Sequence, residues 1–402
     1  MARLLFLSHR IPYPPNKGDK IRSWHILKYL AARHEVSVGA FIDDPEDLAH
    51  QDTVRAIAAD SFFAKISPGI RKAMSARAFL GSGSQSMAFY ADRAMQSWVK
   101  GLIESEKIDA AFLFSSTVAQ FVLPYTDQVP LLMDFVDMDS DKWRQYSLKT
   151  SFPMRGVYAR EASTLAKEEH KIAERAVASF FVSDDEAALF RRQFPNTAGS
   201  IHALENGVDA DFFDPAKVPP AALGEGPIYC FTGAMDYRAN VDAVLWFQKS
   251  VWHTIRASQP KAQFYIVGGK PAPEIIALAE KEGVTVTGRV EDVRPYIARA
   301  DVSIAPLQIA RGIQNKVLEA MAMSKAIVAT PQAFEGIDAI PGKHLEVAAG
   351  AETFASTCLS LSNSPEDRGR MGRAARLLVL NRYGWEARLG ALEPHLNAAL
   401  KT

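Results

Sequence analysis

A lysine and a glutamate three positions apart, Lys316 and Glu319, are well suited to binding an anionic, hydroxyl-bearing ligand. They lie in residues 311–330, where loop, helix, turn and strand signals follow one another. Apolar residues at helical spacing predict a helix over 312–323, and a short apolar run predicts a buried strand over 326–329. A helix start exposes unpaired N–H groups and the positive end of the helix dipole. This run therefore predicts a phosphate site at the start of the helix.

The residues of this helix start have different chemical capacities. Lys316 adds a full positive charge within the first turn, next to the candidates Arg311, Gly312 and Asn315. Glu319 lies one turn further on, and a carboxylate can accept two hydrogen bonds from vicinal hydroxyls such as those of a ribose. The alternative for Glu319 is a surface carboxylate on a helix. The combined pattern favours the ribose-binding role.

The run Lys316-Val-Leu-Glu319-Ala-Met-Ala, followed by a strand and Thr330-Pro331, resembles the donor-site motif of retaining glycosyltransferases of family 4, which have the GT-B fold. The resemblance covers nearly the whole chain. It implies a nucleotide-sugar bound to the second domain, with Glu319 on the nucleotide ribose. That family has another glutamate at the position of Arg311, where it touches the donor sugar.

The wider pattern Arg311-Gly-x-x-Asn-Lys-Val-Leu-Glu319 is similar to a subgroup associated with bacterial surface polysaccharide and exosortase (PEP-CTERM) systems. In such a protein Arg311 or Lys316 would serve the donor diphosphate. Because a cation accepts no hydrogen bonds, Arg311 does not reproduce the sugar contact of the family glutamate.

The composition is that of a soluble globular protein. The 402 residues hold 46 lysines plus arginines against 46 aspartates plus glutamates, so no global field favours nucleic acid. Cys230 and Cys358 lie far apart in apolar surroundings, which indicates packed thiols in a reducing compartment. The N-terminal apolar run is too short for a signal peptide, and no run approaches the ~18 apolar residues of a membrane helix. We therefore expect a cytoplasmic protein, with peripheral contact at the inner membrane surface as the only membrane association.

Alternating buried strands and amphipathic helices predict an α/β protein with two doubly wound parallel sheets. The predicted organisation is a Rossmann-like acceptor domain over 1–196, a linker over 197–226 and a Rossmann-like donor domain over 227–382. The resemblance implies that the two domains face each other across a cleft. It also implies that a last helix, 383–402, packs back on the first domain.

In the first domain, a proline-rich loop after the first strand ends at Lys17, Gly18 and Asp19. The family loop ends in two glycines, so here the close approach of backbone to an acceptor or phosphate depends on Gly18. Lys20 and Arg22 stand nearby as further phosphate partners. The alternative is a tight turn with solvated charges.

Two further strands end in candidate residues. Asp137 follows the strand 130–135, at the edge where open α/β sheets place their sites, and we expect it to orient the acceptor; the alternative is a helix N-cap. In the second domain Gly233 and Arg238 follow the first strand. The resemblance implies donor-diphosphate binding there, and the alternative for Arg238 is a plain surface arginine.

Residues 142–175 form a long helical stretch rich in basic and aromatic side chains, which suits a lipid headgroup region. Glutamates in its later part favour a solvated face with internal ion pairs instead. The first part of the stretch, together with residues 70–77, is the better membrane candidate. A strand over 179–183 is predicted as the last of the first domain.

These features predict a retaining, metal-independent hexosyltransferase-like enzyme that needs no cofactor besides its nucleotide-sugar substrate. Its partners would be a glycan or lipid-linked acceptor and no nucleic acid. Two alternatives stay open: a nucleotide-sugar epimerase on the same scaffold, and a catalytically weak binding subunit of a polysaccharide assembly complex. An NAD-type oxidoreductase is disfavoured because the first loop lacks the fingerprint glycines.

Overall fold

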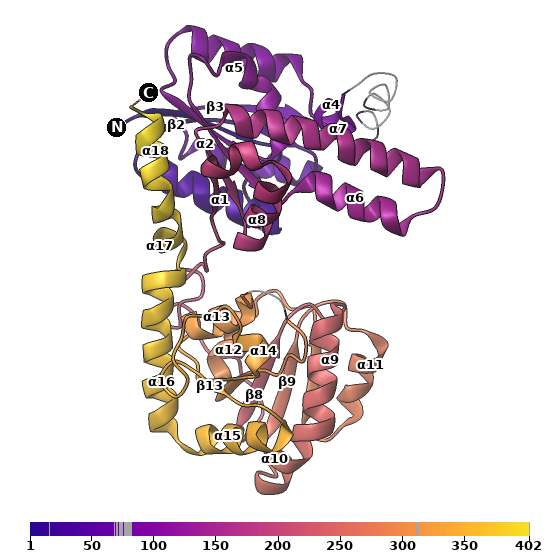
Figure 1. The fold of residues 1–402 in the computed structure, drawn as a ribbon. Coiled ribbons are helices and arrows are strands. Elements are labelled where there is room, and N and C mark those ends of the chain that lie inside the picture. Colours follow the sequence, from indigo (N-terminus) through magenta and orange to yellow (C-terminus); the bar gives the residue numbers. More distant parts are fainter. Residues whose placement is uncertain are drawn as a thin grey trace. The chain divides into compact units, whose positions relative to one another are not determined.

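The computed structural model describes residues 1–15, 17–67, 83–310 and 313–401, with the single positions 69, 71 and 75. The chain divides into two compact units. The first consists of Met1–Asn206 and Arg388–Thr402, and the second of Gly207–Ala387. Each unit is built around its own parallel sheet with helices packed on it (Figure 1).

The first unit holds a seven-stranded sheet in the order β3-β2-β1-β4-β5-β6-β7. Every neighbouring pair is parallel, and the central strands are buried on both faces, which explains their continuous apolar sequences. The strands are β1 Arg3–Ser8, β2 Glu35–Ile42, β3 Asp60–Lys65, β4 Ala110–Phe114, β5 Leu131–Val136, β6 Ala178–Phe181 and β7 Ile201–Ala203.

Helices cover this sheet and return to it from the C-terminal end of the chain (Figure 1). They are α1 Gly18–Ala31, α2 Gln51–Arg55, α4 Gln85–Phe89, α5 Arg93–Glu104, α6 Asp139–Lys149, α7 Met154–Arg175, α8 Asp184–Gln193 and, from the C-terminal segment, α18 Glu393–Ala399. The helix α17, Trp385–Leu389, spans the boundary between the two units.

Two expectations for this unit are wrong. Strand β7 extends the sheet beyond β6, the strand expected to be the last, and it lies inside the range predicted as linker. Three residues give too short a pattern to stand out from a Pro-, Gly- and Asn-rich stretch. The helical stretch 142–175 is two helices: α6 ends at Lys149, where Thr150 is extended, and α7 begins at Met154, directly after Pro153, which has no N–H to continue a helix.

The second unit holds a six-stranded parallel sheet in the order β10-β9-β8-β11-β12-β13. Its strands are β8 Ile228–Thr232, β9 Gln263–Val267, β10 Val284–Gly288, β11 Val302–Ala305, β12 Ile327–Ala329 and β13 Glu346–Val347. Its helices are α9 Arg238–Phe247, α10 His253–Ser258, α11 Pro273–Ile276, α12 Arg294–Arg299, α13 Asn315–Ala322, α14 Pro331–Phe334, α15 Ala351–Asn363 and α16 Pro365–Leu378.

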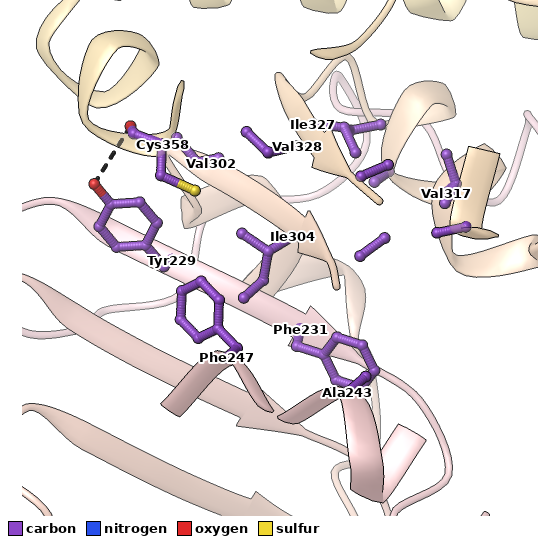
Figure 2. Packing of buried hydrophobic residues seen from close by; sticks show 14 of the residues in the cluster. Tyr229, Phe231, Ala243, Phe247, Val302, Ile304, Val317, Ile327, Val328 and Cys358 are labelled. Atoms are coloured by element: carbon purple, nitrogen blue, oxygen red, sulfur yellow. Dashed lines mark hydrogen bonds between the residues drawn. The ribbon is translucent and has the colours of Figure 1, made fainter. Parts of the chain in front are cut away.

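The core of the second unit fixes the position of α13. Figure 2 shows Phe231 on β8 and Ile304 on β11 in one apolar layer with Val317 of α13. All three side chains are at most 3% exposed. Because a close-packed interior resists displacement, the polar residues on the other face of α13 are held in fixed positions.

Both cysteines are buried, as expected from their apolar neighbours: Cys358 lies in this core and Cys230 in a separate apolar cluster of the same unit. Burial raises the pKa of the Cys230 thiol to about 12, so it stays protonated at neutral pH. Among the described residues, no helix is both long enough and apolar enough to cross a bilayer.

Candidate functional site

A cavity of about 790 Å³ opens in the second unit at the carboxyl ends of its central strands. Its walls come from the loops after β8 and β9, from the end of β10 and from the start of α13. In parallel α/β sheets this edge carries the ligand site, because loops and helix N-termini converge there. The side chains that line the cavity include Asp236, Asn240, Lys270, Arg289, Gln314, Asn315, Lys316 and Glu319.

Glycines allow the loops after β8 and β9 to pack together. A Cβ on Gly268 would lie 1.7 Å from the carbonyl oxygen of Gly233, and one on Gly233 would lie 2.7 Å from Nδ2 of Asn240. The loops are also tied by backbone bonds, with the N–H of Gly233 donating to the Val267 carbonyl at 3.1 Å. The floor of the cavity is therefore bare backbone that a ligand can approach closely.

Lys316 is held in the cavity by neutral partners. Its Nζ donates to Oδ1 of Asn240 at 2.9 Å, and Nδ2 of Asn240 donates to the Ala234 carbonyl at 2.9 Å. The ammonium also lies 5.6 Å from the centre of the Phe231 ring. Burial lowers the pKa of Lys316, and the carboxylate of Glu319 only partly opposes that shift. An anionic ligand would raise the pKa of Lys316 again, because an opposite charge favours the charged form of a lysine.

Glu319 lines the same cavity one helical turn beyond Lys316. Burial raises the pKa of its carboxyl group to about 7, and the nearby Lys316 only partly offsets this. Within the described part of the chain the carboxylate accepts no hydrogen bond. The side chain is half-buried, so its carboxylate is open to a ligand that brings hydrogen-bond donors into the cavity.

The start of α13 adds unpaired donors to the wall. The Gln314 side chain does not cap the helix, and the backbone N–H groups of Asn315 and Lys316 find no acceptor among the residues described. Arg289 adds an exposed guanidinium that forms no ion pair with any described residue. Donors and cations on one side of the cavity suit a phosphate group, and the Glu319 carboxylate suits hydroxyl groups.

The predicted donor residues are brought together in part. Gly233, Asn315, Lys316 and Glu319 all line the cavity. The side chain of Arg238 does not: it is 75% exposed and pairs with Asp242 at 2.8 Å, one turn along α9. That geometry is the surface-arginine alternative, and it arises because Arg238 is the first residue of α9. The positions 311 and 312, predicted as Arg311 and Gly312 of the site, lie outside the described residues.

Sequence reasoning missed Asn240 and Arg289. Asn240 is buried between Lys316 and the loop after β8, a role that depends on a contact across 76 positions. Arg289 follows Gly288, whose φ of +66° marks the turn at the end of β10. A glycine followed by an arginine at a strand end was the available signal.

The charged residues of the predicted loop in the first unit, Lys17 and Asp19, contact neighbouring side chains of the same unit. Lys17 is exposed, with its Nζ 3.9 Å from Asp44, and a Cβ on Gly18 would meet no atom within 4 Å. Asp19 pairs with Arg10 at 2.8 Å and lies 3.5 Å from His9. Burial opposes the charge of Asp19, yet hydrogen bonds from His9 and Arg10 outweigh it and lower the pKa of the carboxyl group.

Lys20 and Arg22, expected as phosphate partners, are buried ion pairs instead. Lys20 donates to Asp47 at 2.6 Å, and both side chains are at most 5% exposed. Arg22 binds both carboxylate oxygens of Asp134, at 2.8 and 3.1 Å, and also donates to the Leu204 carbonyl. A cation that is already neutralised and desolvated has little left to offer a ligand.

Asp137 lies at the carboxyl end of β5, as predicted, and accepts a hydrogen bond from Nζ of Lys142 at 2.7 Å. It is not a helix cap, because the N-cap of α6 is Met138 and no side chain caps there. The preceding Val136 has a φ of +69°, which strains a β-branched residue. Such strain clusters at functional sites, so this turn is the best acceptor-side candidate of the first unit.

In the described ranges no group of three or more His, Cys, Asp and Glu side chains has an arrangement that could hold a metal ion.

Comparisons with known proteins agree with this geometry. Residues 226–364, which include the whole cavity lining, match the family Glycosyl transferases group 1. The fold matches a Rickettsia africae glycosyltransferase over 100% of this chain and 99% of that one, with a TM-score of 0.62 at 15% identity. The chain has the GT-B fold.

Other GT-B structures match over similar lengths. Sucrose-phosphate synthase from Thermosynechococcus elongatus covers 99% of this chain and 100% of its own, with a TM-score of 0.59 at 17% identity. Anabaena HepE in complex with UDP and glucose gives the same coverage and a TM-score of 0.59 at 12% identity. The sequence matches no curated protein. At these identities the comparison with solved structures shows the fold alone, and the predicted GT-B class is confirmed.

Proposed function

We propose that the chain is a glycosyltransferase whose nucleotide-sugar donor binds in the cavity of the second unit. The observation that carries this proposal is the half-buried carboxylate of Glu319, which lines the cavity one turn beyond Lys316 and accepts no hydrogen bond from any described residue. A nucleotide-sugar matches both groups, because its diphosphate needs cations and its ribose offers two adjacent hydroxyl donors. The GT-B fold and the family match support the proposal, as does a relative, HepE, that was solved with UDP-glucose.

The cavity residues would act on the leaving group. When the bond between sugar and diphosphate breaks, negative charge develops on the nucleotide phosphates. We propose that Lys316, the N–H groups at the start of α13 and the guanidinium of Arg289 hold that charge without a metal ion. Glu319 would position the nucleotide by its ribose. Arg311 would add a cation to the diphosphate in place of the family glutamate.

We propose retention of configuration, with a donor phosphate oxygen taking the proton of the acceptor hydroxyl. This mechanism needs no carboxylate nucleophile in the protein. Its support is the resemblance of the α13 motif to retaining enzymes of family 4. Asp137, on the strained turn after β5, is the candidate for orienting the acceptor.

We propose that the acceptor is a polysaccharide or a lipid-linked glycan, assembled on the cytoplasmic side of a bacterial membrane. The Arg-Gly-x-x-Asn-Lys-Val-Leu-Glu pattern supports a role in surface polysaccharide synthesis of the PEP-CTERM type. Family resemblance supplies this part of the proposal, so the acceptor must be identified by experiment.

A thermal-shift screen tests the donor proposal. A panel of UDP-, GDP-, ADP- and CDP-sugars is added to the purified chain, and a specific donor raises the melting temperature with the logarithm of its concentration over its Kd. The best donor is then incubated with cell-envelope glycolipids, and free nucleotide is measured. Stabilisation by no nucleotide-sugar at millimolar concentration would refute the proposal.

Arg311 favours one second candidate, a sugar-nucleotide-binding subunit with little turnover, because it replaces a sugar-contacting glutamate of the family. Such a subunit would bind one donor tightly and release no nucleotide with any acceptor fraction. An epimerase differs from both, because it would convert the donor sugar without any acceptor.

A further inference from the structure

The hairpin formed by α6 and α7 in the first unit carries an exposed apolar tip. Figure 1 shows the turn between these helices at the end that stands away from the strands of the sheet. Phe152 in the turn is 87% exposed, and Leu148 at the end of α6 is 66% exposed. Tyr146 and Met154 beside them are also exposed. Large apolar side chains gathered in this way mark an interaction surface.

Side-chain packing and hydrogen bonds between α6 and α7 hold the hairpin together and keep the tip in place. Trp143 of α6 packs on Tyr158 of α7 with ring centres 5.3 Å apart, and Tyr146 joins both rings. Near its base the buried carboxylate of Glu169 accepts hydrogen bonds from the N–H and the hydroxyl of Ser140. These contacts hold the two helices together from base to tip.

The charged residues in the segment that forms the tip are all cations. Residues 142–160 contain five cations and no acidic residue, in a chain whose net charge is zero. Arg155 is exposed and forms no ion pair with any described residue. Arg144 is 57% exposed, although it also contacts Asp141. The same segment holds four aromatic residues, and this combination of basic, aromatic and apolar side chains suits a bilayer interface.

We infer that the α6–α7 tip docks on the surface of an anionic lipid bilayer. Leu148 and Phe152 enter the boundary between headgroups and acyl chains, while Arg144 and Arg155 contact lipid phosphates. A second copy of the chain is the poorer partner, because two tips would bring the exposed Arg155 of both copies into one interface, where like charges repel. The inference uses no residue of the donor cavity, so it stands or fails separately from the proposed function.

The expected binding depends on both kinds of side chain. Each basic residue near an anionic surface contributes about a fivefold factor in partitioning, and a buried Phe or Leu contributes about tenfold or more. The residues 70–77, the other membrane candidate of the sequence, lie outside the described residues except for positions 71 and 75. The test is therefore confined to the hairpin.

Vesicle flotation of the full chain tests the inference. The wild type should float with vesicles of phosphatidylcholine and phosphatidylglycerol, and at least tenfold less with phosphatidylcholine alone. Leu148→Ser with Phe152→Ser should lower binding to the anionic vesicles at least tenfold. The matched control is Leu377→Ser with Leu380→Ser, on the second unit, where both leucines are 60% and 46% exposed. It should float as the wild type does.

A fluorescent label reports whether the tip itself enters the lipid. Because both native cysteines are buried, Phe152→Cys introduces the one exposed thiol of the chain, which can carry an environment-sensitive dye. Its emission should shift to the blue with anionic vesicles, whereas the same dye on Leu377→Cys should not respond. Circular dichroism and thermal unfolding without any ligand confirm that each variant folds as the wild type does.

Three results would overturn the inference. The wild type fails to float with anionic vesicles, or it floats while the dye at position 152 stays unchanged. The third is concentration-dependent self-association that Leu148→Ser with Phe152→Ser abolishes, which would make the tip a contact between copies of the chain.

Discussion

Replacing Glu319 by glutamine should change stability and donor affinity in opposite directions. The amide keeps the size of the side chain and removes its charge. In the free protein this removes the charge of a half-buried carboxylate that has no hydrogen-bond donor among the described residues. In the complex it removes the charged acceptor for the ribose hydroxyls. A residue that is only structural would not divide the two effects in this way.

The stability gain follows from the pKa of Glu319, which is about 7 against an ordinary value of 4.5. One pKa unit corresponds to about 1.4 kcal/mol, so ionising this group costs the folded protein up to about 3 kcal/mol. Because the folded pKa is the higher one, wild-type stability from this group is complete below pH 4.5 and is lost as the pH rises through 7. The variant should therefore be 1 to 3 kcal/mol more stable at about pH 8 and nearly equal at about pH 4.5.

The affinity loss follows from the bonds to the carboxylate. A hydrogen bond to a charged group is worth about 1.5–3 kcal/mol, so the Kd for the nucleotide-sugar should rise about 10- to 150-fold. Urea unfolding at two pH values measures the first effect. Calorimetric titration with the donor from the thermal-shift screen measures the second.

Glu346→Gln is the matched control. Glu346 lies on β13 of the same unit, burial also raises the pKa of its carboxyl group, and it does not line the cavity. Its replacement should leave donor affinity unchanged. The reasoning is refuted if Glu319→Gln binds the donor as tightly as the wild type, or if it is less stable at pH 8.

Three other substitutions test how the site is built. Gly268→Ala should destabilise the second unit by about 3 kcal/mol or more in urea unfolding, because the new Cβ meets the Gly233 carbonyl. Its control, Gly269→Ala, should be nearly neutral, because that Cβ meets its nearest atom at 3.5 Å. Arg22→Met should lower the free energy of unfolding by about 3–5 kcal/mol, because it leaves Asp134 buried without its partner. Adding Asp134→Leu should recover part of that loss. Equal stability of the single variant and the wild type would contradict the buried pair. Arg289→Ala should weaken binding of a nucleoside diphosphate several-fold in a titration, while Arg238→Ala should not, and the reverse order would show that the cavity is wrongly assigned.

The parts of the fold and site that sequence predicted are those with local signals. Lys316 and Glu319 are one helical turn apart, and their relation depends only on α13 forming. Continuous apolar runs likewise predicted the buried strands and their doubly wound arrangement, whereas the GT-B class was implied by the resemblance to family 4. Motif and periodicity therefore predicted several residues that line the cavity, among them Lys316 and Glu319.

The parts that sequence missed depend on distant partners. Arg22 looks like a free cation beside a glycine loop, but its partner Asp134 lies 112 positions away on β5. Asn240 supports Lys316 across 76 positions. Periodicity carries no information on such pairs. For Arg238 a local signal was present, because Asp242 follows one turn later on the same helix.

The central claim is tested most directly by a crystal structure of the full chain with the nucleotide-sugar that stabilises it most. The account predicts that the diphosphate lies at the start of α13 within reach of Lys316. It also predicts both ribose hydroxyl oxygens about 2.5–3.0 Å from the carboxylate of Glu319. A donor bound outside the cavity, or a Glu319 carboxylate with no contact to it, would contradict the account.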